Sequence, residues 1–241
     1  QDLYENLSLK QCEEHFDELT SSAYSVSLFT DWRAASFNQV WIKRRVNNGD
    51  SFKPPAELFG ATLAARALHP ISTLSAENCT EQMGIQGAWH ERLPHFRLDF
   101  TPSSGEELQS EYILPRQHAL AALQALDKIR AQVSPLLQVS EVRTIAADQL
   151  WMSTCYQQDS VAIHFTWHKN WQAVRRLLPL IEEQLALFDA RPHWGKLFST
   201  PPARIKALYP KLKDFQQLLR HYDPEGKFRN DFLDRYIFGE D

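Results

Sequence analysis

Apolar residues recur every three to four positions in three segments of the chain, which is the spacing of one face of an amphipathic helix. These segments are residues 6–20, 115–133 and 170–188. The second opens with Pro-Arg, and proline is favoured in the first turn of a helix. Pro179 lies inside the third segment, where its missing N–H and its ring predict a kink. After the loop that begins at Arg191, the charged tail is also predicted to be helical.

Shorter runs rich in aromatic and β-branched residues predict strands. They cover residues 23–32, 37–46, 95–102, 108–115, 137–145 and 161–167, with a turn at 103–107. Residues 47–91 are predicted to form a long excursion across the surface, with one helix-like patch at 59–68. The order strand–strand–helix–strand–strand–helix predicts an α+β fold, a mostly antiparallel sheet flanked by helices.

Composition limits the classes of function. Of the 241 residues, 43% are hydrophobic, and the net charge of −4 provides no basic surface to attract nucleic acid. No apolar stretch approaches the roughly 20 residues of a membrane span, and the first residues lack the pattern of a signal peptide. Cys12, Cys79 and Cys155 lie far apart, which favours reduced thiols in a cytoplasmic protein. Because the chain starts with Gln rather than Met, we expect a processed product or a fragment.

Alternation along three predicted strands gathers polar side chains on one face of each strand. The polar pairs are Gln109 and Glu111, Glu141 and Arg143, and His164 and Thr166, whereas Val161, Ile163, Phe165 and Trp167 point the other way. One interpretation is a sheet with one solvated side, which is common. The other is that this face lines a cavity for a polyhydroxylated ligand, which is held by several donors and acceptors. The pattern alone leaves both interpretations open.

No motif identifies a self-contained catalytic centre. The chain has no G-x-S-x-G, P-loop, H-E-x-x-H or C-x-x-C sequence, and "GATLAA" is not a dinucleotide-binding fingerprint. His90 and His95 have no third ligand at metal-site spacing, so no metal is expected. Taken singly, Glu141 and Arg143 are typical of an exposed ion pair worth under about 1 kcal/mol, and Lys196 is typical of a solvated side chain.

The loop "RPHWGK" at residues 191–196 and the tail "YPKLKDFQQLLRHYDPEGKFRNDFLDR" resemble the C-terminal half of flavin-dependent sugar-alcohol and aldonolactone oxidases, which are vanillyl-alcohol-oxidase-like flavoproteins. Longer segments resemble the alditol (xylitol) oxidase branch of that family. These are "YSVSLFTDW", "ERLPHFRLDFTPSSGEELQSEYILPR", "SEVRTIAADQLWMS", "VAIHFTW" and "RPHWGKLF", in this order along the chain.

The resemblance implies a division of the protein. Residues 10–200 would form the substrate or cap domain, built on an antiparallel sheet, and residues 201–241 a helical segment that returns to a flavin-binding domain. The N-terminal FAD-binding domain itself has no counterpart in this chain. We therefore expect FAD to be bound mainly by that missing domain, and the chain alone to be inactive.

The resemblance also assigns roles to individual residues. Glu141 and Arg143 match an E-x-R that binds substrate hydroxyls, and Lys196 matches a lysine beside the flavin and the oxidised hydroxyl; these three would be catalytic. The substrate-binding set would comprise Gln109, Glu141, Arg143, His164, Thr166 and Lys196. His193 is a weaker candidate for contact with the flavin, since with Trp194 it fits better as a residue that shapes the loop.

The implied reaction is the oxidation of the terminal hydroxyl of a sugar alcohol by O2, giving an aldose and H2O2, with FAD as cofactor. An aldonolactone oxidase of the D-arabinono- or L-gulonolactone type is the alternative enzyme. A non-catalytic sugar-binding fragment is the alternative from another class, and an unrelated α+β domain is hard to reconcile with so many motifs in order.

Overall fold

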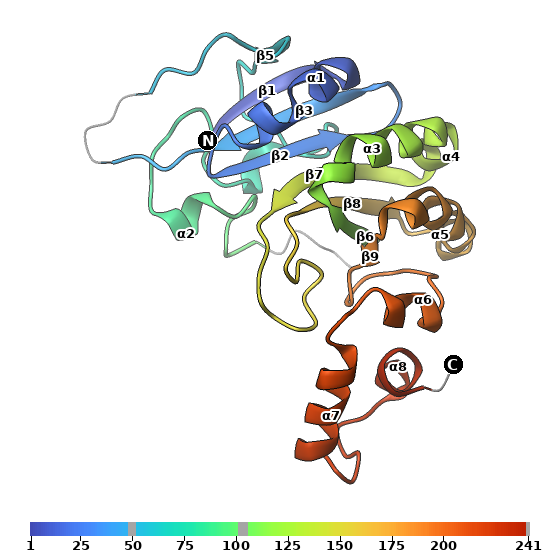
Figure 1. Ribbon diagram of the computed structural model, residues 1–241. Helices are drawn as coiled ribbons and strands as arrows, with labels where there is room; N and C mark the ends of the chain where they lie inside the picture. Colours follow the sequence, from blue (N-terminus) through green and yellow to red (C-terminus); the bar gives the residue numbers. More distant parts are fainter. Residues whose placement is uncertain (48–51, 101–105, 240–241) are drawn as a thin grey trace.

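The computed structural model describes residues 1–47, 52–100 and 106–239. Nine strands form one sheet in the order β4-β5-β1-β3-β2-β7-β8-β6-β9, and the pairings of neighbouring strands are antiparallel (Figure 1). The strands are β1 (Asp2–Ser8), β2 (Ser25–Thr30), β3 (Ser36–Lys43), β4 (Glu57–Leu58), β5 (Ala61–Leu63), β6 (Glu107–Pro115), β7 (Leu137–Ile145), β8 (Ser160–His168) and β9 (Arg191–Pro192). The predicted α+β class is confirmed.

Helices lie around this sheet. The α-helices are α1 (Leu9–Thr20), α2 (Trp89–Arg92), α3 (Ala119–Lys128), α4 (Arg130–Val133), α5 (Trp171–Leu185), α6 (Pro202–Ala207), α7 (Leu212–Tyr222) and α8 (Asp231–Leu233). Short 3₁₀ turns are η1 (Ala76–Asn78), η2 (Arg116–His118), η3 (Ser134–Leu136) and η4 (Ala186–Phe188), and η5 (Asp234–Phe238) is a π-helical turn. No helix among residues 1–47, 52–100 and 106–239 combines the length and apolar character needed to cross a bilayer.

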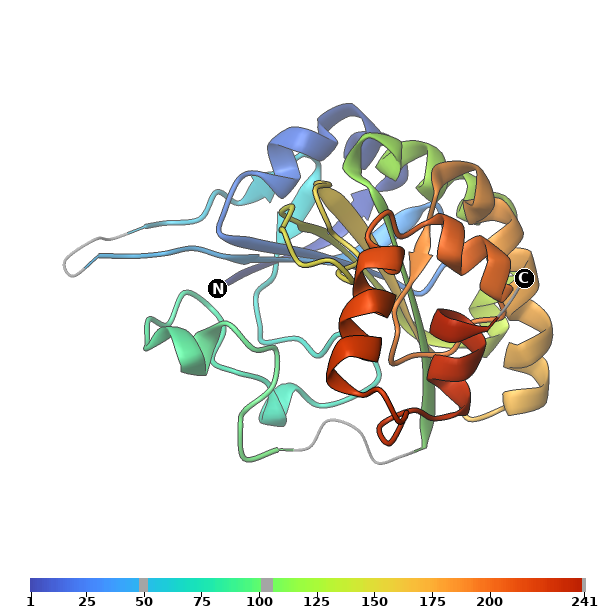
Figure 2. The same cartoon turned by 60° about the horizontal axis from the view of Figure 1, so that its bottom comes forward.

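One face of the sheet carries the main core. Helices α1, α3 and α5 pack on it; in Figure 2, α1 and α3 lie above the sheet and α5 lies to its right. From the sheet this core receives side chains such as Tyr112, Phe165 and Trp167, each at most 1% exposed, the last two with rings stacked 5.0 Å apart. The amphipathic spacing of α5 explains its contribution, because Leu177 and Ile181, one turn apart, are both buried. Helix α5 continues through Pro179 as one α-helix from Trp171 to Leu185.

On the opposite face of the sheet, the described residues form a smaller apolar cluster. The segment between β5 and β6, teal to green in Figure 2, packs Ala64, Leu68 and Cys79 against Phe29 and Trp41 of the sheet. These contacts lie on the β2–β3 half. The β7–β8–β6 half of the same face carries the polar residues singled out by the alternating pattern.

Three predictions of secondary structure are wrong in part. The helix predicted at 6–20 begins only at Leu9, because residues 6–8 belong to β1, which pairs with both β3 and β5, and Asn6 has a left-handed φ of 66°. The helix-like patch at 59–68 is instead the β4–β5 hairpin, whose turn places Phe59 and Gly60 at φ 48° and 83°. Residues 95–100 form no strand apart from one bridge between Phe96 and Cys79.

The remaining predictions hold. Strands at 23–32, 37–46, 108–115, 137–145 and 161–167 are confirmed, with ends shifted by a few residues. The helix predicted at 115–133 is present as η2, α3 and α4, interrupted at Ile129. The helical tail is confirmed as α6 to η5, with its own apolar cluster. Most of the turn predicted at 103–107 lies outside the described residues. All three cysteines are buried and free.

Candidate functional site

The strand register brings the predicted site residues onto one face of the sheet. Strand β8 lies between β6 and β7, and His164 is the register partner of both Glu111 and Glu141. Thr166 is the partner of Gln109 one step along the same face. Because residues two apart share a face, Arg143 joins the set, and Lys196 reaches it from the loop after β9. We call these seven residues the polar cluster: Gln109, Glu111, Glu141, Arg143, His164, Thr166 and Lys196.

Glu111 is the centre of this cluster. One carboxylate oxygen accepts from Arg143 Nη2 at 2.8 Å, and the other accepts from Lys196 Nζ at 2.6 Å. The side chain of Glu111 is 3% exposed, whereas those of Lys196 and Arg143 are 18% and 40% exposed. Burial alone would raise the pKa of Glu111, but Arg143 and Lys196 outweigh it and hold this pKa below its ordinary value. One buried anion therefore fixes two cations that remain partly accessible.

Backbone pairing sets the position of Lys196. The N–H of His193 donates to the Glu111 carbonyl, and the N–H of Leu197 donates to the Gln109 carbonyl, both at 2.9 Å, so the loop runs along the edge of β6. Within the loop, the Gly195 N–H donates to His193 Nδ1 at 3.1 Å. Lys196 is therefore held beside β6 at both ends of the loop, and its ammonium reaches the carboxylate of Glu111.

Trp194 and His193 serve the loop in different ways. The indole N–H of Trp194 donates to the Met152 carbonyl at 3.0 Å, and its ring packs 4.8 Å from that of Tyr209. This anchors the loop against the helical tail rather than over the polar cluster. His193 is exposed and accepts the Gly195 N–H, which fits the prediction that it shapes the loop. Its contact with a flavin stays a prediction.

Glu141 occupies the other side of Arg143. Its Oε2 lies 3.5 Å from Arg143 Nη1, and its Oε1 lies 3.1 Å from Nε2 of His95. Burial would raise the pKa of Glu141, yet the hydrogen bond from His95 and the charge of Arg143 bring this pKa far below its ordinary value. Both carboxylates in the cluster are therefore ionised at neutral pH, balancing the charges of Arg143 and Lys196.

His164 adds a neutral group to this face. Burial, followed by the charge of Lys196, lowers the pKa of His164 to about 4. Its Nε2 lies 3.3 Å from Oε1 of Gln109, so the Nε2–H tautomer donates to that amide oxygen. Thr166, half-buried, lies beside this pair in the register. The cluster thus combines two cations, two anions, an amide, a hydroxyl and a neutral imidazole, the mixture that binds a neutral polyhydroxylated molecule.

Sequence reasoning missed three residues around the cluster. These are Glu111, His95 and Lys43, none of which belongs to the predicted substrate-binding set. The alternating pattern gives a signal for Glu111, which lies two residues from Gln109. No local pattern links His95 or Lys43 to Glu141, because they come from a loop and from β3.

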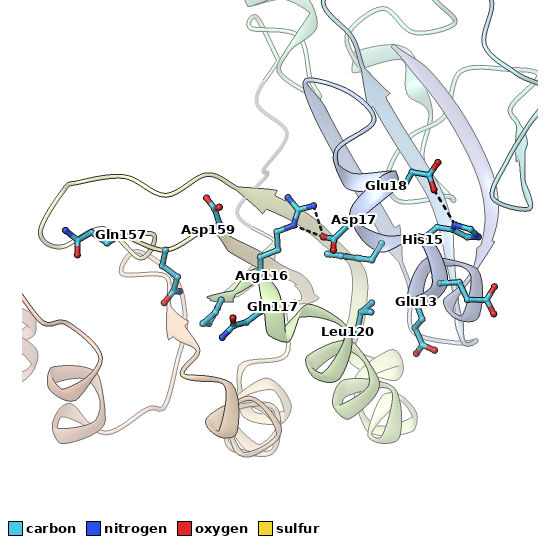
Figure 3. A pocket seen from close by; sticks show the side chains of 13 residues that line it. Glu13, His15, Asp17, Glu18, Arg116, Gln117, Leu120, Gln157 and Asp159 are labelled. Carbon is cyan, nitrogen blue, oxygen red and sulfur yellow. Dashed lines mark hydrogen bonds and ion pairs between the residues drawn. The ribbon is translucent and has the colours of Figure 1, made fainter.

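A wide hollow in the described part of the chain lies away from the polar cluster. It has a volume of about 700 Å³ and is open to solvent between α1, the start of the α3 region and the β7–β8 connection (Figure 3). We call it the acidic hollow because Glu13, Glu14, Asp17, Glu18 and Asp159 line it, together with Arg116. Across the described part of the chain, no three His, Cys, Asp or Glu side chains are grouped so that they could hold a metal ion.

Sequence comparisons find relatives among sugar-alcohol and aldonolactone oxidases. An alditol oxidase from Streptomyces sp. (strain IKD472 / FERM P-14339) is 52% identical over 233 residues, which is 97% of this chain and 54% of that protein. An L-gulono-1,4-lactone dehydrogenase from Mycobacterium tuberculosis (strain ATCC 25618 / H37Rv) and an L-gulonolactone oxidase from Scyliorhinus torazame are each 30% identical over 54% of this chain and 30% of their own lengths. The chain thus spans about half the length of the first relative, and less of the other two.

A family-level match covers the part of the chain that holds all seven residues of the polar cluster. The profile of D-arabinono-1,4-lactone oxidase matches residues 103–236, more than half of the chain. This range includes β6, β7, β8 and the Lys196 loop. The predicted resemblance to alditol and aldonolactone oxidases is therefore confirmed, and the chain belongs to the D-arabinono-1,4-lactone oxidase family.

Proposed function

We propose that this chain is the substrate-binding part of a larger FAD-dependent oxidase that oxidises the terminal hydroxyl of a sugar alcohol, with O2 as electron acceptor. One observation carries the proposal: Glu111 draws Arg143 and Lys196 together on the polar half of the sheet, at 2.8 and 2.6 Å. The 52% identity to an alditol oxidase over 97% of the chain supports a sugar alcohol as substrate. The products would be an aldose and H2O2.

The donors of the polar cluster are compatible with a flavin beside them. Lys196 and Arg143 keep part of their surfaces exposed although both are paired to a buried carboxylate. From this chain, Lys196, and more weakly His193, would contact the flavin, and a domain outside the chain would hold most of FAD. When bound, FAD supplies the acceptor for the hydride that leaves the alcohol carbon.

The residues of this chain would place and polarise the substrate. As the hydroxyl gives its proton to solvent, negative charge would grow on its oxygen, and a cation within hydrogen-bond reach stabilises that charge most in the transition state. Lys196 and Arg143 are suited to this because Glu111 fixes both. Glu141 would accept a hydrogen bond from a neighbouring hydroxyl and orient Arg143. Gln109, His164 and Thr166 would bind the remaining hydroxyls.

We further propose the division into a cap at residues 10–200 and a tail at 201–241. The separate apolar cluster formed by Ile205, Tyr209, Tyr236 and their neighbours supports a distinct tail. Strand β1 (Asp2–Ser8), which lies before the proposed boundary at residue 10, pairs within the same sheet. Free, buried cysteines support a cytoplasmic location. A flavin-binding domain would be the partner of this chain.

An aldonolactone oxidase is the second candidate. The family profile and the two gulonolactone relatives favour it, and a lactone also presents several hydroxyls. Peroxide formation by the flavin-loaded full-length protein distinguishes the candidates when xylitol, sorbitol, D-arabinono-1,4-lactone and L-gulono-1,4-lactone are compared. We expect the highest kcat/KM with xylitol or sorbitol. Preference for a lactone would support the second candidate, and no peroxide with any of the four would favour a non-catalytic sugar-binding role.

A further inference from the structure

A chain of hydrogen bonds runs from Lys43 of β3 through His95 to Glu141 of the polar cluster. Neither Lys43 nor His95 belongs to the proposed substrate contacts. Lys43, at the end of β3, is 6% exposed, and its ammonium donates to the carbonyls of Leu93 at 2.5 Å and Pro94 at 3.0 Å. The same ammonium lies 3.2 Å from Nδ1 of His95. The other ring nitrogen of His95 lies 3.1 Å from Oε1 of Glu141. Lys43 is thus connected to Glu141 through one imidazole.

The two partners determine which nitrogen of His95 carries the proton. An ammonium has only donors, so Nδ1 must accept from Lys43. Burial lowers the pKa of Lys43 to about 8, which leaves the ammonium form in excess at pH 7. The carboxylate of Glu141 has only acceptors, so Nε2 must donate to it. The neutral Nε2–H tautomer is the form of His95 that satisfies both contacts.

Packing also fixes the plane of this ring. The imidazole of His95 meets the rings of Trp41 and Phe29 edge-on, with centroids 5.1 and 5.6 Å away. Thr80 holds the same segment, since its N–H donates to the His95 carbonyl at 3.0 Å and its hydroxyl donates to the Pro94 carbonyl at 2.7 Å. His95 therefore has a fixed position, orientation and tautomer, which are the requirements for orienting a partner.

We propose that His95 is a positioning residue for the polar cluster, with Lys43 fixing its tautomer. By donating a hydrogen bond to Oε1 of Glu141, His95 orients the other oxygen, Oε2, toward Nη1 of Arg143, which lies 3.5 Å away. The orientation of Glu141 then determines where a substrate hydroxyl meets the carboxylate and the guanidinium. The inference rests on the proposed function, because it assigns His95 an effect on substrate binding rather than on the fold alone.

The first test measures steady-state kinetics of the flavin-loaded full-length protein with xylitol. Loss of a hydrogen bond to a charged group predicts that His95→Ala raises KM by about 10- to 100-fold, with a smaller fall in kcat. His95→Gln can accept from Lys43 and donate to Glu141, so we expect its KM within about threefold of wild type. His69→Ala is the matched control, because His69 lies in the same segment and its ring bonds locally to Ile71; its KM should be unchanged.

Several outcomes would overturn the proposal. If His95→Ala and His69→Ala share the wild-type KM, or if His95→Gln is as impaired as His95→Ala, the residue does not position Glu141. If the wild-type protein forms no peroxide with xylitol, the proposed function fails instead. The positioning role is then judged from crystal structures: the proposal expects Glu141 and Arg143 to move in His95→Ala and to stay in place in His95→Gln.

A readout independent of activity tests the tautomer. Long-range ¹H–¹⁵N correlation spectra of the chain at pH 7, with His95→Gln used for assignment, should show a protonated Nε2 and an unprotonated Nδ1 in His95. In Lys43→Met the donor to Nδ1 is lost, so the Nδ1 shift should change or the Nδ1–H tautomer should appear. A doubly protonated ring or an Nδ1–H tautomer in the wild type would contradict the assignment.

Discussion

The polar cluster and the acidic hollow both gather charged side chains, but they differ in burial. In the cluster, the side chains of Glu111 and Glu141 are 3% and 9% exposed, and each contacts Arg143. In the hollow, Asp17 is 85% exposed and is paired with Arg116. Water screens the attraction between Asp17 and Arg116. The attraction between Arg143 and the two buried carboxylates is stronger, and a buried charge that loses its partner costs free energy. We therefore expect the site at the polar cluster, where burial holds the charges in place, rather than in the hollow.

The largest difference between the two regions is expected in catalysis. In the flavin-loaded full-length protein, Lys196→Met removes a cation that would stabilise the developing negative charge. We expect the rate of flavin reduction by xylitol to fall by roughly 10²- to 10³-fold, as for the loss of a comparable donor. Rapid mixing without oxygen measures this rate. Lys169→Met, which removes an exposed partner of Glu106, should leave it unchanged, and a normal rate in Lys196→Met would remove Lys196 from the mechanism.

A smaller difference is expected in stability. Glu111→Ala leaves Lys196 and Arg143 without their shared partner, which should lower the free energy of unfolding by about 2 kcal/mol, allowing for the partial exposure of Arg143. Asp17→Ala, in the acidic hollow, should lower it by less than about 1 kcal/mol. Urea denaturation of the chain measures both. Equal losses in the two variants would show that burial does not distinguish the two regions.

The smallest effect concerns pH. The pKa of His164 is lowered to about 4 in the folded chain, against an unfolded value of about 6.5. Between these values the unfolded state binds the proton and the folded state does not, so stability is lost as pH falls from 6.5 toward 4. His164→Gln should reduce the loss between pH 6.5 and 4.5 by on the order of 1 kcal/mol. Identical pH profiles for wild type and variant would contradict the burial of a neutral imidazole.

The sequence predicted the polar face because strand alternation is local. His164 and Thr166, or Glu141 and Arg143, share a face whatever strands lie beside them. It could not predict that Glu111 joins Arg143 to Lys196, because that depends on β6 and β7 flanking β8 and on a loop 85 residues away in the chain. Only the resemblance pointed to Lys196.

The errors in secondary structure have the same origin. Residues 6–8 belong to strand β1, which pairs with β3 and β5. The helix-like spacing of Leu7, Leu9 and Cys12 gives no sign of these two partner strands. The apolar patch near Phe59 contains the turn of the β4–β5 hairpin, where Phe59 and Gly60 adopt positive φ, and β5 pairs with β1. In both places tertiary pairing outweighed the local pattern.

The most direct test of the central claim is a crystal structure of the flavin-loaded full-length protein with xylitol bound. We predict that hydroxyls of xylitol lie within hydrogen-bond distance of Lys196, Arg143 and Glu141, with Glu111 still contacting both cations. Xylitol bound in the acidic hollow, or anywhere away from the β7–β8–β6 half of the sheet, would contradict it.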